Sequence, residues 1–222
     1  HDLTQTMMMD EMCLLVDEND NVIGSKSKLE CHKGIGVRHR AFSVLIFDSK
    51  NRLLVQKRST DKITFPGVWA NSCCSHPLDL NEERNGSEGA ERAAIRKLSQ
   101  ELGIPEEVSM DWDFHHIGRM EYSCRWNNEW VEREIDHIFI VNSDAEINHN
   151  DNEISDVLWA DLDTINKMMS GEGVWSNEII APWFRLIWKN FFDDEKGEFG
   201  SIANKQISEI VYCGEVDMSG DP

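Results

Sequence analysis

Basic residues are scarce in this chain of 222 residues: 22 lysines and arginines stand against 41 aspartates and glutamates, and the formal net charge is −19. Nucleic-acid binding depends on a basic surface, so this composition argues against DNA or RNA as the main partner. It still allows a small anionic ligand, which a few convergent lysines and arginines can hold. Because long-range attraction of an anion is unfavourable here, any phosphate site must be short-range or assisted by a metal ion.

Long apolar runs and targeting signals are also lacking. No window approaches the length of a membrane span, and the three methionines at positions 7–9 are too few for the apolar core of a secretory signal. Residues 218–222 do not form a peroxisomal signal. We expect a cytoplasmic protein without a membrane span. Because the chain starts at His1, an upstream segment for organelle targeting could have been removed.

The cysteines show no disulfide framework. The six stand at positions 13, 31, 73, 74, 124 and 213, and the adjacent Cys73 and Cys74 are poor partners for an ordinary disulfide, so we expect a reducing compartment. No linker, internal repeat or low-complexity tract is visible, and this length favours one domain. We expect a flexible N-terminus at residues 1–10, one domain at 11–193, and an acidic extension at 194–222 that packs on the domain or trails from it.

Hydrophobic patterning predicts a mixture of strands and helices. Strands are expected at residues 12–16, 22–25, 41–47, 52–58, 116–123, 130–141 and 207–213. The run at 41–47 is apolar almost throughout, which is typical of a strand buried on both faces. Helices are expected at 87–102, capped by Ser87 and ended by Gly103, at 161–169, closed at Gly171, and at 182–192, opened by Pro182.

Residues 69–77, with the sequence WANSCCSHP, fit neither pattern. Pro77 disfavours the α conformation at His76, and a turn at 64–67 leads abruptly into this stretch. We therefore expect a rigid, irregular segment that presents a thiol and an imidazole, as segments that carry chemistry often do. The alternative is that the paired cysteines are small buried hydrophobic residues.

Two groups of side chains could join this segment in one site. The first could bind a divalent ion through imidazole and carboxylate ligands, and comprises His32, His39, His76, Glu132 and Glu134. The second is cationic, could hold a diphosphate, and comprises Lys28, Arg58, Lys62 and Lys97. Glu101 lies four residues after Lys97 on one helix face and could hold Mg²⁺ against phosphate oxygens. For both groups the alternative is a set of ordinary solvated side chains.

Three segments resemble type I isopentenyl-diphosphate Δ-isomerase, a family of the Nudix superfamily. They are residues 39–43 (HRAFS), 69–77 and 132–136 (EREID), and residues 96–104 (RKLSQELGI) are similar to a degenerate Nudix box. The likeness runs from about residue 12 to residue 192, and the order and separation of the motifs make it specific. It implies an α+β fold, with a Nudix-like mixed sheet flanked by helices in an α/β/α sandwich and a single domain.

The resemblance implies roles for individual residues. The implied catalytic residues are Cys74, Glu134, Tyr122, which hydrogen-bonds the glutamate, and Trp183. The implied metal ligands are His32, His39, His76, Glu132 and Glu134, with Glu101 at a second, diphosphate-bridging Mg²⁺. The implied substrate contacts are Lys28, Arg58, Lys62, Ser75 and Lys97. The chain departs from the family at His137, where tyrosine is usual, and in a short loop between His32 and His39.

The implied reaction, in isoprenoid biosynthesis, converts isopentenyl diphosphate to dimethylallyl diphosphate through a tertiary carbocation. We place Glu134 and Tyr122 on the protonating side and Cys74 on the deprotonating side, although the residues alone leave the order open. Trp183 would stabilise the cation, and the helix opened by Pro182 would help to exclude water. The implied cofactors are Mg²⁺ at the diphosphate and Mn²⁺, Zn²⁺ or Mg²⁺ at the histidine–glutamate site. We expect a monomer or weak homodimer.

Two other functions remain as alternatives. A Nudix pyrophosphohydrolase, acting on a nucleoside diphosphate derivative, needs carboxylates on the Nudix helix to gather Mg²⁺. Lys97 and Gln100 occupy two acidic positions of that box, which disfavours hydrolysis. A non-catalytic binding module stabilised by metal would instead unfold when the metal is chelated.

Overall fold

The computed structural model describes residues 3–192 and 206–219. Its strands are β1 (Met12–Val16), β2 (Val22–Ser27), β3 (His39–Phe47), β4 (Leu53–Arg58), β5 (Trp69–Ala70), β6 (Cys73–Ser75), β7 (His115–Arg125), β8 (Val131–Asn142), β9 (Ile154–Ala160) and β10 (Ile210–Asp217). Its helices are α1 (Leu3–Met8), α2 (Lys28–His32), α3 (Gly86–Leu102), α4 (Glu106–Ser109), α5 (Leu162–Ser170) and α6 (Pro182–Ile187). Short 3₁₀ turns cover Asn81–Glu83 and Gly173–Asn177, and a π-helical turn covers Trp188–Phe192.

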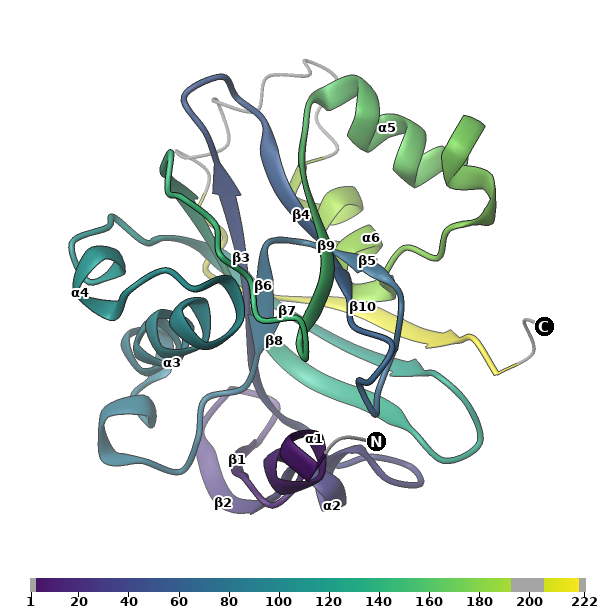
Figure 1. The fold of residues 1–222 in the computed structure, drawn as a ribbon. Helices are drawn as coiled ribbons and strands as arrows, with labels where there is room; N and C mark the ends of the chain where they lie inside the picture. The colour runs from purple at the N-terminus through teal and green to yellow at the C-terminus, as the bar shows by residue number, and fades with distance from the viewer. Residues whose placement is uncertain (1–2, 193–205, 220–222) are drawn as a thin grey trace.

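The strands form one branched, mixed sheet between two helical layers (Figure 1). The main path runs β10-β7-β8-β3-β1-β2, with β4, β5, β6 and β9 branching from it. One apolar cluster packs the sheet against α3, and the other packs it against α5 and α6. This arrangement is the predicted α/β/α sandwich.

Strand β3 lies where the sheet branches. All nine of its residues are buried, as the apolar run at 41–47 predicts, because alternate side chains enter the two clusters. Phe42 packs toward α3, whereas Leu45 packs toward α5 and α6. Strand β3 pairs in parallel with β8 and antiparallel with β6. It therefore holds β6 and β8, which are far apart in the sequence, in fixed positions beside it.

The prediction of an irregular segment at residues 69–77 is wrong in part. Residues 69–70 form β5 and residues 73–75 form β6, in which Cys74 pairs with Ser43 of β3, so the irregular backbone is confined to residues 71–72 and 76–77. A short strand next to a fully buried one is fixed by hydrogen bonds to its neighbour, so its own composition says little about it. The turn before it contains two residues of positive φ, Phe65 at 47° and Gly67 at 71°.

The helix boundaries differ from prediction at both α3 and α6. Ser87 is not the N-cap of α3: the cap is Asn85, whose carbonyl accepts the first helical hydrogen bond from Gly89. At the other end Gly103 adopts φ 68°, as predicted, and a Cβ there would lie 2.2 Å from the carbonyl oxygen of Asn148. Pro182 opens α6, but the α-helix ends at Ile187 and a π-helical turn continues to residue 192.

The termini are more ordered than the sequence predicts. Residues 3–8 of the predicted flexible N-terminus form α1, whose Gln5 is only 4% exposed. Its amide donates to Asn152 and Glu153, and contacts so distant in sequence leave no local pattern. In the predicted extension the strand lies at β10, parallel to β7, slightly later than expected. The extension's residues 194–205 and 220–222 lie outside the described part.

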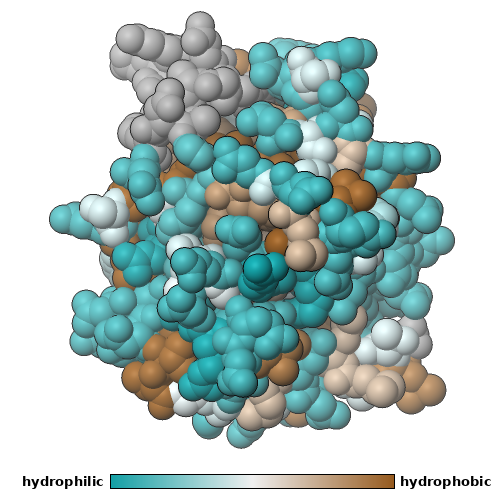
Figure 2. Space-filling model, turned by 90° about the vertical axis from the view of Figure 1, so that its left-hand side faces the viewer, coloured by the Kyte–Doolittle hydropathy of each residue, from teal (hydrophilic) through white to brown (hydrophobic). Residues whose placement is uncertain are grey.

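The molecular surface agrees with the acidic composition. Figure 2 shows a mostly hydrophilic face on which hydrophobic residues form separate patches. Across residues 3–192 and 206–219, no helix is both long and apolar enough to cross a membrane.

Candidate active site

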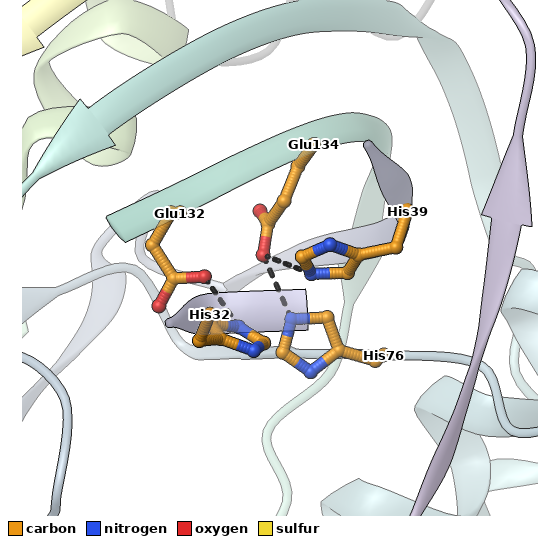
Figure 3. A group of neighbouring side chains, drawn as sticks. All are labelled: His32, His39, His76, Glu132 and Glu134. Atoms are coloured by element: carbon orange, nitrogen blue, oxygen red, sulfur yellow. Dashed lines mark hydrogen bonds and ion pairs between the residues drawn. The ribbon is translucent and has the colours of Figure 1, made fainter. Parts of the chain in front are cut away.

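Five buried side chains from four segments converge on one point (Figure 3). They are His32 at the end of α2, His39 at the start of β3, His76 after β6, and Glu132 and Glu134 on β8. Glu132 and Glu134 alternate on the strand and so share a face, and the parallel register places His39 beside Glu134. One potential ligand atom from each of the five lies within 4.8 Å of all the others.

The histidine tautomers prepare this centre for a cation. The Nδ1–H groups of His32 and His39 donate to the carbonyl oxygens of Lys28 and Val37, both at 2.7 Å. Each Nε2, the position at which a ring can carry either a proton or a metal ion, then faces the centre, where His32 Nε2 lies 2.7 Å from Glu132 Oε2 and His39 Nε2 lies 3.4 Å from Glu134 Oε1. Among the described residues, these two nitrogens and Glu132 Oε2 have no hydrogen-bond partner.

These unpartnered acceptor atoms fit a metal ion. Lone pairs that face one another in a buried site repel unless a cation lies between them, and backbone acceptors behind metal-bound histidines are the usual support. The five side chains can therefore hold a divalent metal, as the sequence predicts.

Strong electrostatic coupling links the ligands. Burial lowers the pKa of His39, but the hydrogen bond and charge of Glu134 outweigh it and raise that pKa to about 9. Burial raises the pKa of Glu134, but His39, Glu132 and Tyr122 together lower it to about 2. Burial and the charges of His39 and His32 lower the pKa of His76. Glu134 is thus a carboxylate and His76 a neutral imidazole.

A cavity adjoins the metal centre, and about 440 Å³ of space, part of it open to solvent, lies between its walls. Its lining comprises Lys28, Phe42, Ser43, Arg58, Lys62, Thr64, Cys74, Ser75, His76, Glu101, Tyr122, Glu132, Glu134 and Trp183. The Tyr122 hydroxyl donates to Glu134 Oε2 at 2.6 Å. The structure therefore brings together Cys74, Glu134, Tyr122 and Trp183, the four side chains expected to be catalytic.

The two adjacent cysteines point to different environments. Cys74 lines the cavity, and burial raises the pKa of its thiol to about 12, so the sulfur carries a proton. Cys73 is fully buried in the cluster against α3, with its sulfur 3.7 Å from Glu101 Oε2. Strand alternation thus makes one thiol a cavity residue and the other a small core residue.

Cationic side chains surround one part of the cavity. Lys28, Arg58 and Lys62 line it together with Ser75 and Glu101. The Arg58 guanidinium is fixed because its Nε and Nη2 donate to the carbonyl oxygens of Phe65 and Thr64, both at 2.9 Å. Its central carbon lies 5.6 Å from the centre of the Trp183 ring.

Lys97 differs from the other cations. It does not line the cavity, and its ammonium is buried 3.0 Å from Glu101 Oε1, so its position does not support the predicted substrate contact. The sequence also missed Glu153, a buried carboxylate that forms an ion pair with Lys62. Glu153 lies in a polar stretch without periodicity, and no local signal could have identified it.

His137, at the position where the resemblance implies tyrosine, belongs to a buried network behind β8. Its Nε2 lies 2.7 Å from Asp20 Oδ2, and Arg40 Nε donates to the other carboxylate oxygen at 2.8 Å. Asp20 adopts φ 68° in the β1–β2 turn, and its carboxylate lies between the His137 ring and the Arg40 guanidinium. The histidine at this position therefore has a buried hydrogen-bond partner in Asp20.

Comparisons with known proteins identify the family of this chain. The NUDIX domain family model matches residues 37–184. The isopentenyl-diphosphate delta-isomerase of Gibberella zeae is 37% identical over 94% of this chain and 85% of its own length. The isopentenyl-diphosphate Delta-isomerase 1 of Bos taurus is 40% identical over 86% of both chains, and a chloroplastic one from Cannabis sativa is 40% identical over 92% of this chain and 76% of its own length.

The fold has a parallel among solved structures. The crystal structure of DR0079 from Deinococcus radiodurans superposes with a TM-score of 0.59, covering 81% of this chain and 98% of that one. At 17% identity this likeness concerns the fold alone. On the strength of the family match and the curated relatives, the chain belongs to the isopentenyl-diphosphate delta-isomerase family of Nudix-domain proteins.

Proposed function

We propose that this chain isomerises isopentenyl diphosphate to dimethylallyl diphosphate. The observation that carries the proposal is the presence of a thiol and a metal-site carboxylate, Cys74 and Glu134, in the walls of one cavity. They come from β6 and β8, the two strands that flank β3. Moving a double bond requires one carbon to gain a proton and another to lose one, so two proton-exchanging groups around one substrate suit this reaction.

The diphosphate is expected to bind at the cationic part of the cavity. Lys28, Arg58 and Lys62 supply positive charge, and Ser75 supplies a hydroxyl group. Glu101 would share a Mg²⁺ with the diphosphate oxygens, which is the usual way in which proteins hold this ion. We assign Lys97 to the support of Glu101, because the two groups form a buried ion pair.

The histidine–glutamate centre would hold Mn²⁺, Zn²⁺ or Mg²⁺, since three imidazoles and two carboxylates suit such cations. When bound, the ion would neutralise the two carboxylates and fix the orientation of Glu134. Proton transfer itself is assigned to the side chains of the cavity.

We place Tyr122 and Glu134 on the protonating side of the substrate. The low pKa of Glu134 leaves its carboxylate ionised, so the proton of this pair resides on the Tyr122 hydroxyl, 2.6 Å away. Delivery of that proton to the terminal methylene carbon creates the tertiary carbocation. Loss of a proton from the neighbouring methylene group to the Cys74 sulfur completes the reaction. Before this step the Cys74 proton passes to solvent, to which the cavity is partly open, and the nearby positive charge of Arg58 favours the thiolate against burial. After the product leaves, Tyr122 takes up a proton from solvent and Cys74 releases one to it, which restores both groups.

Trp183 would protect the carbocation. It is 4% exposed, and its indole Nε1 has no hydrogen-bond partner among the described residues. The ring face can stabilise a desolvated cation by about 2 kcal/mol. Phe65 packs edge-on against it, with ring centres 5.1 Å apart, and this apolar wall restricts capture of the cation by water.

Proton NMR of isopentenyl diphosphate incubated with the protein and Mg²⁺ in D₂O tests the proposal. We expect deuterium to enter the allylic product. Release of phosphate from nucleoside diphosphate derivatives, without isomerisation, would instead support the hydrolase. The ion pair of Lys97 with Glu101 disfavours that alternative, because it places a cation where a hydrolase needs further carboxylates.

The proposed location is a reducing compartment, the cytoplasm. It is supported by the six cysteines, all of which are free thiols in the structure. The monomeric or weakly dimeric state remains a prediction.

A further inference from the structure

Glu153 lies directly behind the cavity and has both carboxylate oxygens engaged. It is 2% exposed and is not part of the cavity lining. Its Oε2 accepts from the Lys62 ammonium, and its Oε1 accepts from Gln5 Nε2 at 2.8 Å. The same Gln5 amide donates to the carbonyl oxygen of Asn152 at 3.1 Å. A chain of contacts therefore runs from α1, through Glu153, to a cation of the cavity.

The same N-terminal segment also supports a second cation. Lys28 begins α2 and lines the cavity, and its main-chain N–H donates to the carbonyl oxygen of Glu11 at 2.7 Å. The next N–H, of Leu29, donates to the carbonyl oxygen of Met9 at 2.9 Å. Figure 1 accordingly shows α1 beside α2. None of residues 3–11 lines the cavity. They nevertheless hold Glu153, the partner of Lys62, and the main chain of Lys28, and both of these lysines line the cavity.

A lysine needs such support more than an arginine does. Its ammonium sits on a flexible four-carbon stem, whereas Arg58 is already fixed by two carbonyl oxygens. Lys62 is 7% exposed, and among the described residues its ammonium donates to Glu153 and to no oxygen of the cavity lining. Fixing the ammonium before the anion arrives avoids the loss of side-chain freedom on binding. The Glu153 carboxylate is the group that fixes it.

We propose that Glu153 is a positioning residue for Lys62 in the diphosphate subsite, and that Gln5 of α1 holds Glu153 in the required orientation. The inference rests on the proposed function, because it assumes that Lys62 contacts the substrate diphosphate. It gives the N-terminal helix a part in substrate affinity.

Two variants test this inference, Glu153→Gln and Gln5→Ala. Each is measured by steady-state kinetics with isopentenyl diphosphate and by calorimetric titration with inorganic diphosphate in the presence of Mg²⁺. We expect Glu153→Gln to raise both KM and the diphosphate Kd about tenfold, equal to about 1.4 kcal/mol, with kcat within about twofold. Gln5→Ala leaves the ion pair between Lys62 and Glu153 in place, so we expect it to raise KM and the diphosphate Kd only about threefold.

Glu178→Gln is the matched control. Glu178 pairs with Lys57 on the same strand as Arg58, with Nζ–Oε distances of 3.0 and 2.7 Å, and neither partner lines the cavity. This variant removes the same charge from a lysine–glutamate pair that is about one third exposed, in which Glu178 also accepts from Trp69 Nε1 at 3.1 Å, so a general effect of losing a carboxylate appears here too. We expect its KM and diphosphate Kd to match those of the unmodified protein.

The outcomes separate this inference from the proposed function. Unchanged diphosphate affinity in both variants, or a fall in kcat at constant KM, overturns the positioning role. If circular dichroism shows that Glu153→Gln does not fold, Gln5→Ala decides, since only the peripheral amide is removed. If the unmodified protein binds diphosphate but does not isomerise isopentenyl diphosphate, the proposed function is wrong. The diphosphate Kd values of the two variants then still test whether Glu153 and Gln5 position Lys62.

Discussion

Replacing the two adjacent cysteines one at a time gives the sharpest test of the site. Cys74 lines the cavity, whereas Cys73 is buried in the apolar cluster against α3. The two substitutions to alanine remove the same atom from neighbouring positions, so each serves as the control for the other. A catalytic role for the thiol and a packing role for its neighbour predict opposite effects on turnover and stability.

The magnitudes follow from the two environments. Loss of a group that transfers a proton in the transition state lowers turnover about 10²–10⁴-fold, and we expect this of Cys74→Ala. Cys73→Ala removes one buried sulfur atom, comparable with a methylene group, and leaves a small cavity, so it costs roughly 1–2 kcal/mol. In a domain of this size that lowers Tm by about 2–8 °C.

The assay combines turnover of isopentenyl diphosphate with thermal unfolding followed by circular dichroism. We expect Cys74→Ala to keep its Tm within about 2 °C while losing turnover, and Cys73→Ala to lose stability while keeping turnover below its Tm. Near-normal turnover of Cys74→Ala would refute the role of the thiol. Equal loss of activity in both variants would show that the strand as a whole, rather than one sulfur, is required.

Three further predictions concern a hydroxyl group of the cavity, the metal centre, and the buried Asp20 carboxylate of the β1–β2 turn. Tyr122→Phe removes the hydroxyl that donates to Glu134, so we expect turnover to fall about 10²-fold with little change in Tm; unchanged turnover would contradict its place in proton transfer. Chelation of divalent ions should abolish turnover at concentrations that leave the circular dichroism unchanged, whereas simultaneous loss of both would favour a metal-stabilised binding module. Asp20→Asn leaves the buried Arg40 without its charge partner and should lower the free energy of unfolding by about 3–5 kcal/mol, measured by urea denaturation. Burial raises the pKa of Asp20, but His137 and Arg40 outweigh it and lower that pKa below its usual 3.8. The Asp20 carboxylate therefore stabilises the fold above pH 3.8, and this contribution is lost as the pH falls through the lower pKa of the folded state. Denaturation midpoints that Asp20→Asn leaves unchanged near neutral pH would contradict this account.

Features with a local sequence signature could be predicted. The apolar run at 41–47 identified the buried strand, and the alternation of Glu132 and Glu134 placed both carboxylates on one face. The histidines were candidates by residue type, but their convergence depends on the pairing of β3 with β8, which the local patterns do not contain. The family resemblance supplied that missing step.

Contacts between distant segments could not be predicted. Gln5 and Glu153 are separated by 148 residues, and each is unremarkable in its own segment. Lys97 is a different case: its partner Glu101 lies four residues later on the same helix face, and this spacing alone does not decide between an ion pair and a contact with the substrate. Side chains whose partners lie across the fold carry no periodic or spacing signal, so only the structure distinguishes them from surface residues.

Because β6 and β8 both hydrogen-bond to β3, the spacing of Cys74 and Glu134 is built into the main chain. Ser43 is opposite Cys74 in the antiparallel ladder with β6, and His39 is opposite Glu134 in the parallel ladder with β8. Changes confined to the loops that join these strands therefore leave the distance between the thiol and the carboxylate unaltered. A shift in the register of β3 with either neighbour would change that distance.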